Sequence, residues 1–103
     1  MQKPREKHNQ PFPTHRTIRR ACSRELYRTV KRLKKRIPKA KMKEAENFYI
    51  KKVLLHLPFI VENEQNRRKL VDWWDEHVSS FIAELWEVDR HDLSRAFRDA
   101  FGG

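Results

Sequence analysis

The chain has 103 residues and a formal net charge of +10, and 37% of its residues are charged while 38% are hydrophobic. Six Phe, three Trp and two Tyr give it an aromatic content that excludes a permanently disordered tail. There is no apolar run of the roughly eighteen residues that a membrane-spanning helix needs, and a lone cysteine, Cys22, excludes a disulfide scaffold. We therefore expect one small globular domain that works in the reducing cytoplasm, without a membrane as partner.

Positive charge is concentrated in the first half of the chain. Residues 1–52 contain 18 Lys or Arg and 4 Asp or Glu, whereas residues 53–103 contain 6 and 10. In a uniformly basic chain, the charge would indicate no more than solubility. A basic half joined to an acidic half indicates that the two halves have different roles. The pattern favours a polyanionic partner for the first half.

Residues 1–13 are predicted to form a basic arm, and residues 14–103 a single helical domain. Pro4, Pro11 and Pro13 cannot sustain a helix or an interior strand. Two interpretations remain for the arm. It is either a frayed terminus without a role, or a flexible segment that becomes ordered when it binds along the phosphates of a nucleic acid.

The spacing of apolar residues predicts a first helix from Thr14 or Thr17 to Ile37. Either threonine can cap its N-terminus, and Pro38 ends it because the residue before a proline disfavours helical geometry. Six apolar residues fall three or four positions apart and form a narrow stripe that we expect to be buried: Ile18, Cys22, Leu26, Val30, Leu33 and Ile37.

The opposite face of this helix carries positive charge over about five turns. Glu25 is the only acidic residue of the helix. Like charges at this spacing destabilise a helix, so a face of one sign favours binding to an anionic ligand over a merely solvated surface. Phosphate contacts would supply the affinity, and Tyr27 would stack on an unpaired base. The predicted nucleic-acid-binding residues of this helix are Arg16, Arg20, Arg24, Tyr27, Arg28, Lys31, Lys34 and Lys35.

A second helix is predicted over Lys39–Leu57, closed by Pro58. Its C-terminal half is apolar nearly all round, which indicates burial on several sides. Lys39 and Lys41 extend the basic surface, and they join the predicted nucleic-acid-binding residues. The short connection around Pro38 predicts that the first two helices are antiparallel neighbours.

A third helix, Asn63–Glu87, is predicted with a wide apolar stripe and two tryptophans at its margins. Trp73 and Trp86 lie about 120° and about 100° from the centre of that stripe, on opposite sides, at the usual 100° per residue. Tryptophans in such positions either seal the edge of a core, in line with their usual burial, or anchor a protein-binding patch. For the second interpretation, Trp73 and Trp86 are the predicted protein-interaction residues.

A fourth helix is predicted over Arg90–Phe101, with Asp89 as its N-cap and Gly102 as its stop. The expected fold is therefore all-α, a small bundle of about four helices with a basic, proline-containing arm before it. Aromatic residues at the rim of the bundle make a homodimer a reasonable expectation.

The sequence offers no constellation for catalysis, metal binding or cofactor binding. The five histidines are scattered, and Cys22 has no Cys-x-x-Cys partner. Both glycines lie at the end of the chain, which excludes a Gly-rich phosphate loop. Zinc fingers, RNA-recognition sheets and KH loops lack their residues as well. We therefore expect no enzyme, no cofactor, no metal and no small-molecule substrate.

These patterns predict a small, non-enzymatic accessory or regulatory protein that contacts the phosphate backbone of DNA or RNA through a basic helix face. The alternative is a protein-interaction adaptor or inhibitor that docks on a larger machine, through the same basic face or through the Trp-rich third helix. Charge alone does not separate DNA from RNA as the ligand.

Overall fold

The computed structural model describes residues 12–102, and the regular structure among them is entirely helical. The predicted all-α bundle is confirmed, although it has six described helices in place of four. The predicted arm falls almost wholly on residues 1–11, outside the described residues. The helices are α2 (His15–Leu33), α3 (Lys39–Leu55), α4 (Leu57–Glu62), α5 (Arg67–His77), α6 (Ser79–Trp86) and α7 (Arg90–Phe101).

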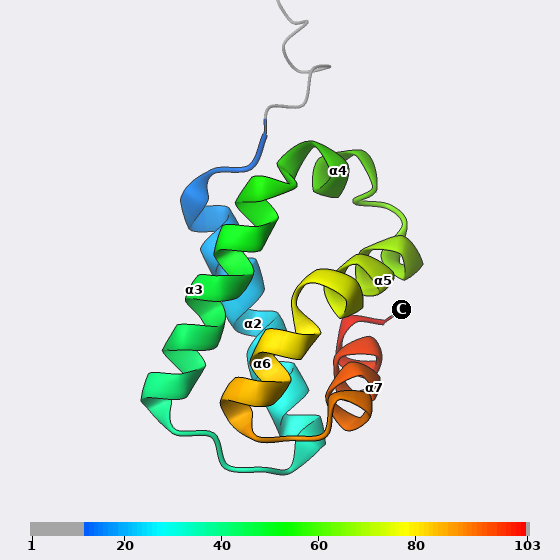
Figure 1. Cartoon of the computed structure of the whole chain (residues 1–103). Coiled ribbons are helices and arrows are strands. Elements are labelled where there is room, and N and C mark those ends of the chain that lie inside the picture. Colours follow the sequence, from blue (N-terminus) through cyan, green and yellow to red (C-terminus); the bar gives the residue numbers. More distant parts are fainter. Residues whose placement is uncertain (1–11, 103) are drawn as a thin grey trace, which may run out of the picture.

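The first and the last of these helices form the most extensive contact of the bundle. In Figure 1, α2 runs behind α3 and α6, and it packs on α7 and on α3. The antiparallel pairing of α2 with α3 agrees with the short connection between them (Figure 1). None of the helices among residues 12–102 combines the length and the apolar character that crossing a bilayer requires.

Helix α2 begins as predicted but ends four residues early. The Thr14 hydroxyl accepts a hydrogen bond from the Thr17 amide at 3.1 Å and caps the N-terminus. The predicted end at Ile37 is wrong, because Lys34 adopts the left-handed conformation (φ 56°) and its amide closes the helix on the Val30 carbonyl. The following residues then cross over to α3 in a non-helical connection.

Helix α3 ends at Leu55, and a separate short helix, α4, follows it. The prediction placed the end of the second helix at Leu57 and treated Pro58 only as a stop. In the structure, Pro58 lies in the first turn of α4, where a missing amide costs no helical hydrogen bond. Helix α4 was not predicted from the sequence.

The predicted third helix, Asn63–Glu87, starts too early, because residues 63–66 are not helical and Asn66 caps α5. The rest of it is two helices, α5 and α6, that meet at Val78. The Ser79 hydroxyl donates to the Asp75 carbonyl at 2.6 Å, and an Arg90 guanidinium nitrogen donates to the same carbonyl at 3.0 Å. That carbonyl is the one that the Ser79 amide would use in a continuous helix. Side-chain hydrogen bonds of this kind compete with the backbone pattern, and the chain changes direction here.

The core lies between the helices and is built around an aromatic stack. The rings of Trp74 and Phe97 lie parallel with their centroids 3.8 Å apart. The ring of Tyr49 meets each of them edge-on at 6.2 Å. Helix α7, which carries Phe97, has the predicted bounds and the predicted Asp89 cap.

Candidate nucleic-acid interface

Six of the ten predicted nucleic-acid-binding residues share the outer face of α2. All six are exposed, and they lie opposite the buried stripe that includes Ile18, Cys22 and Leu26. Tyr27 is 55% exposed and lies among the basic side chains. From its first to its last residue the face is about 22 Å long, at 1.5 Å of rise per residue. We call it the basic face of α2, and it comprises Arg16, Arg20, Arg24, Tyr27, Arg28 and Lys31.

Among residues 12–102, no carboxylate forms an ion pair with a cation of this face. The four ion pairs found among residues 12–102 all involve other helices or loops. Glu25, the one acidic residue of α2, turns away from the face and accepts a hydrogen bond from the Tyr49 hydroxyl at 2.5 Å. Burial raises the pKa of Glu25, while the Tyr49 hydrogen bond and the nearby Arg24 act in the opposite direction. The cations of the basic face therefore have no ion-pair partner among the described residues, although Arg24 and Arg28 lie near enough to Glu25 to lower its pKa.

The other four predicted residues lie beyond the C-terminal end of α2. Lys34 is the left-handed cap, and Lys39 is exposed at the start of α3. Lys35 donates to the Glu87 carbonyl at 3.3 Å, and the Lys41 ammonium lies 3.6 Å from the Glu87 carboxylate. Glu87 therefore pairs with Lys41 and holds Lys35 through its carbonyl, which makes these two lysines a weaker part of the candidate interface than the face on α2.

Two exposed arginines are absent from the predicted nucleic-acid-binding residues. Arg19 lies on α2 toward the edge of the basic face, and Arg36 lies in the connection to α3. Both are exposed, and neither takes part in an ion pair of the described residues. For Arg19, the narrow buried stripe could have signalled exposure, because it leaves well over half of the helix circumference to solvent. No helical spacing could have placed Arg36, which lies after the end of α2.

Trp73 and Trp86, the predicted protein-interaction residues, are buried, with 6% and 2% of their surface exposed. The Trp86 indole donates to the Lys41 carbonyl at 3.2 Å, which explains its inward position. Their predicted positions at opposite margins assumed one continuous helix. Because the chain changes direction at Val78, the angular offsets do not carry across the break, and both indoles belong to the core.

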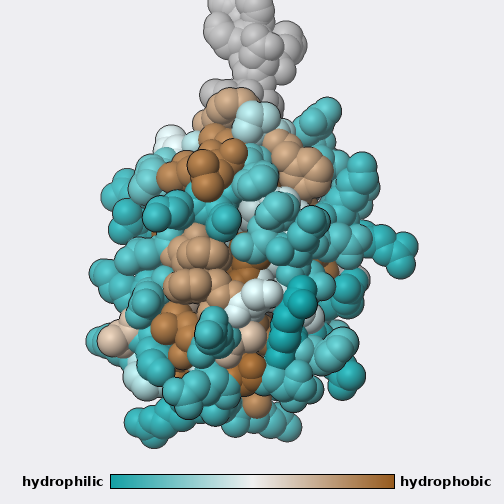
Figure 2. All heavy atoms as spheres, in the orientation of Figure 1, coloured by the Kyte–Doolittle hydropathy of each residue, from teal (hydrophilic) through white to brown (hydrophobic). Residues whose placement is uncertain are grey.

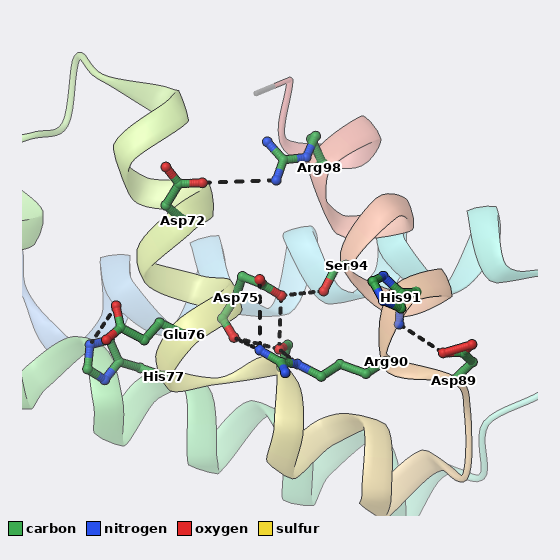
Figure 3. A network of polar contacts seen from close by, with 10 residues as sticks. Asp72, Asp75, Glu76, His77, Asp89, Arg90, His91, Ser94 and Arg98 are labelled. Atoms are coloured by element: carbon green, nitrogen blue, oxygen red, sulfur yellow. Dashed lines mark hydrogen bonds and ion pairs between the residues drawn. The ribbon is translucent and has the colours of Figure 1, made fainter.

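A second polar cluster, drawn in Figure 3, joins α5, α6 and α7. The Ser94 hydroxyl donates to the Asp75 carboxylate, and the Ser79 hydroxyl oxygen lies 3.1 Å from the same carboxylate. Arg90 donates to the Ser79 hydroxyl at 3.0 Å, and Arg98 lies 4.0 Å from Asp72. The groups of this cluster are largely paired with one another, so we assign it to holding α7 against the turn between α5 and α6.

Two histidines that are far apart in the sequence lie close together. The rings of His56 and His77 have their centroids 4.6 Å apart, and each lies beside the indole of Trp73. Spacing along a helix could not reveal this contact, because His56 lies between α3 and α4 while His77 is the last residue of α5. Within residues 12–102, however, no three His, Cys, Asp or Glu side chains gather in a way that would hold a metal ion.

Comparison with protein-family models, with curated proteins and with solved structures found no match for this chain.

Proposed function

We propose that this protein is a small nucleic-acid-binding accessory or regulatory protein, and that the basic face of α2 contacts the phosphate backbone. One observation carries the proposal. The face is exposed along its whole length, and its cations are without a carboxylate partner among the described residues. A solvated surface without a ligand normally mixes the two signs of charge.

The dimensions of the face suit a phosphate backbone. Arg16, Arg20, Arg24 and Arg28 follow one another at four-residue steps, about 6 Å apart along the helix axis. Each strand of duplex DNA places one phosphate about every 3.4 Å along its axis. The face is therefore long enough for each of its cations to neutralise a separate phosphate. Release of the condensed counterions would supply the affinity.

Tyr27 adds a contact that phosphate binding alone does not need. Its ring is more than half exposed among arginines and lysines. Aromatic rings in a basic surface stack on unpaired bases with little regard to sequence. Tyr27 therefore favours a single-stranded ligand, or a single-stranded segment of a folded RNA, over a duplex.

The test is a titration of the full chain into labelled single-stranded RNA, single-stranded DNA and duplex DNA. Charge reversal by Arg24→Glu and Arg28→Glu should weaken binding about a hundredfold or more at low salt, since it removes two cations and adds two anions. The matched control, Arg68→Glu with Lys69→Glu, makes the same change of net charge at exposed positions of α5. Equal loss in both variants would show that net charge matters and that the face does not.

A protein-interaction role is the second candidate, and the exposed apolar side chains of α3 and α6 favour it. Phe48 and Phe81 stack across the two helices with their centroids 4.0 Å apart, and Leu55 is 67% exposed. Figure 2 shows brown patches among the hydrophilic side chains on the face where α3 and α6 lie. Negligible binding of all three nucleic acids at low salt would favour this role. Pull-downs that compare the intact protein with Phe81→Ser would then test it.

A further inference from the structure

Helices α3 and α6 expose apolar side chains on one side of the bundle. The rings of Phe48 and Phe81 stack across the two helices with their centroids 4.0 Å apart, and Phe81 is 36% exposed. Leu55 follows Phe48 by seven residues, which places it on the same side of α3, and it is 67% exposed. The brown patches of Figure 2 lie on this side of the molecule. Exposed apolar side chains that gather in this way mark a site of protein contact.

The two helices run in opposite directions beside one another. The phenylalanine stack joins the middle of α3 to α6, and the Trp86 indole at the end of α6 donates to the carbonyl of Lys41 near the start of α3. Figure 1 shows the same antiparallel arrangement. Side chains that precede Phe48 in α3 and side chains that follow Phe81 in α6 therefore share one end of this surface.

Charges of opposite sign lie on the two sides of the phenylalanine pair. Glu44 precedes Phe48 by four residues and Lys52 follows it by four, so the three lie on one side of α3, about 6 Å apart along its axis. Glu84 of α6 adds an exposed carboxylate at the end of Glu44, and Lys51 adds an exposed cation at the end of Lys52. None of these four charged groups forms an ion pair within the described residues.

This pattern is complementary to a second copy of itself. A two-fold axis at Phe48 places a second α3 antiparallel to the first, so that Glu44 of each copy faces Lys52 of the other. The phenylalanine pairs of the two copies meet at the centre. A two-fold dimer needs a self-complementary patch of this kind, and it is the commonest assembly of identical chains. We propose that the chain forms a two-fold dimer through α3 and α6, with Phe48 and Phe81 at its centre and two symmetric contacts between Glu44 and Lys52.

The dimer interface leaves the basic face of α2 free. In Figure 1, α2 runs behind α3 and α6, and it packs on α3 through its buried stripe, opposite the basic face. The basic faces of the two copies would therefore point away from each other, which keeps their positive charges apart. The inference rests on the protein-interaction role proposed for the apolar side chains of α3 and α6, and it does not depend on nucleic-acid binding.

The test is sedimentation equilibrium of the full chain without nucleic acid, from about 10 μM to about 1 mM. We expect a reversible monomer–dimer equilibrium with a dissociation constant in the micromolar range, as is usual for a small interface. A chain that is still monomeric at the highest concentration overturns the proposal. That result leaves the protein-interaction role to a different partner, which the pull-downs with Phe81→Ser detect separately.

Charge reversal distinguishes this interface from any other. Glu44→Lys and Lys52→Glu each turn two attractive contacts of the dimer into two repulsive ones, so each variant alone should dimerise about tenfold more weakly. The double variant restores opposite charges at both contacts with the net charge of the wild type, and it should recover most of the affinity. Lys31→Glu on α2 is the matched control for Lys52→Glu and should leave the dimer unchanged. Single reversals without effect, or a double variant without recovery, overturn the proposal.

A mixture of the two single variants gives a further test. In the mixed dimer, positions 44 and 52 are both basic in one copy and both acidic in the other, so both contacts are attractive. Native mass spectrometry of an equimolar mixture should therefore show the mixed dimer in clear excess over its statistical share. A statistical distribution of the three dimers overturns the contact between Glu44 and Lys52.

The apolar centre is tested by Phe81→Ser, which should weaken the dimer about tenfold. Tyr27→Ser removes an exposed ring from the basic face of α2 and should leave the dimer unchanged. Circular dichroism checks that both variants are folded. Unaltered dimerisation of a folded Phe81→Ser contradicts the proposal, and the charge variants remain informative where Phe81→Ser fails to fold.

Discussion

The salt dependence of nucleic-acid binding is the sharpest test of the basic face of α2, because the structure fixes its number of cations. If each cation neutralises one phosphate of a duplex, the logarithm of the association constant falls with the logarithm of the salt concentration with a slope of about −4.5. Raising the salt from about 50 to about 200 mM then weakens binding about 500-fold. The five cations are Arg16, Arg20, Arg24, Arg28 and Lys31.

Replacement of Arg24 and Arg28 by Gln removes two of these five cations and keeps good helix formers in α2. The slope should fall to about −2.7, and the same increase in salt should weaken binding only about 40-fold. The control replaces Arg68 and Lys69 of α5 by Gln, which removes the same charge from exposed positions outside the face. Its slope should stay at about −4.5.

Fluorescence anisotropy of one labelled duplex, measured at five or more salt concentrations, gives all three slopes. Because salt screening removes the electrostatic contribution, the affinities of the wild-type and variant proteins should converge at high salt. Equal slopes for the wild type and the α2 variant would refute the reasoning, since the two arginines would then not contact phosphates. A wild-type slope shallower than about −2 would also refute it, because fewer than three cations would be engaged.

Four further predictions follow from single residues. Tyr27→Ala should weaken single-stranded binding by about 1–3 kcal/mol and leave duplex affinity nearly unchanged, as measured by anisotropy. Phe97→Ala should lower the free energy of unfolding by about 3–5 kcal/mol in urea titrations, because it removes the stacking partner of Trp74 from a closely packed core. Burial raises the pKa of the Cys22 thiol, so iodoacetamide should not modify the folded protein at neutral pH and should modify it readily in denaturant. Because the pKa of Glu25 is raised on folding, the folded chain binds more protons there than the unfolded chain. Stability should therefore fall as the pH rises from the ordinary glutamate pKa through the raised one. Urea unfolding at several pH values should show this decrease in the wild type and a smaller one in Glu25→Gln.

The sequence predicted the parts of the fold that local patterns determine. The bounds of α7 and the start of α2 were predicted correctly, because capping residues mark both. The break at Val78 was not predicted, because it depends on Arg90 and Ser79 bonding to one carbonyl, and Arg90 comes from another part of the chain. Pro58 was interpreted as a stop, whereas the same residue also starts α4.

In the candidate interface, too, the features that follow from local sequence patterns were predicted, and those that depend on tertiary contacts were not. The exposure of the basic face follows from the helical period alone, so the sequence placed its six residues correctly. The contacts of Lys35 and Lys41 with Glu87 are tertiary and had no counterpart in the spacing.

The packing of α2 on α7 has a consequence for the order of folding. The earliest described helix of the chain finds its largest partner in the last one, so this contact closes a loop of most of the domain. Loop closure of that length is slow compared with helix formation. During synthesis, the apolar stripe of α2, with Ile18 and Leu26, stays without its main partner until Phe97 and its neighbours have been added. A nascent chain that stops before α7 would therefore present an amphipathic, strongly basic helix to the ribosome and to chaperones, and the core would close only with the last helix in place.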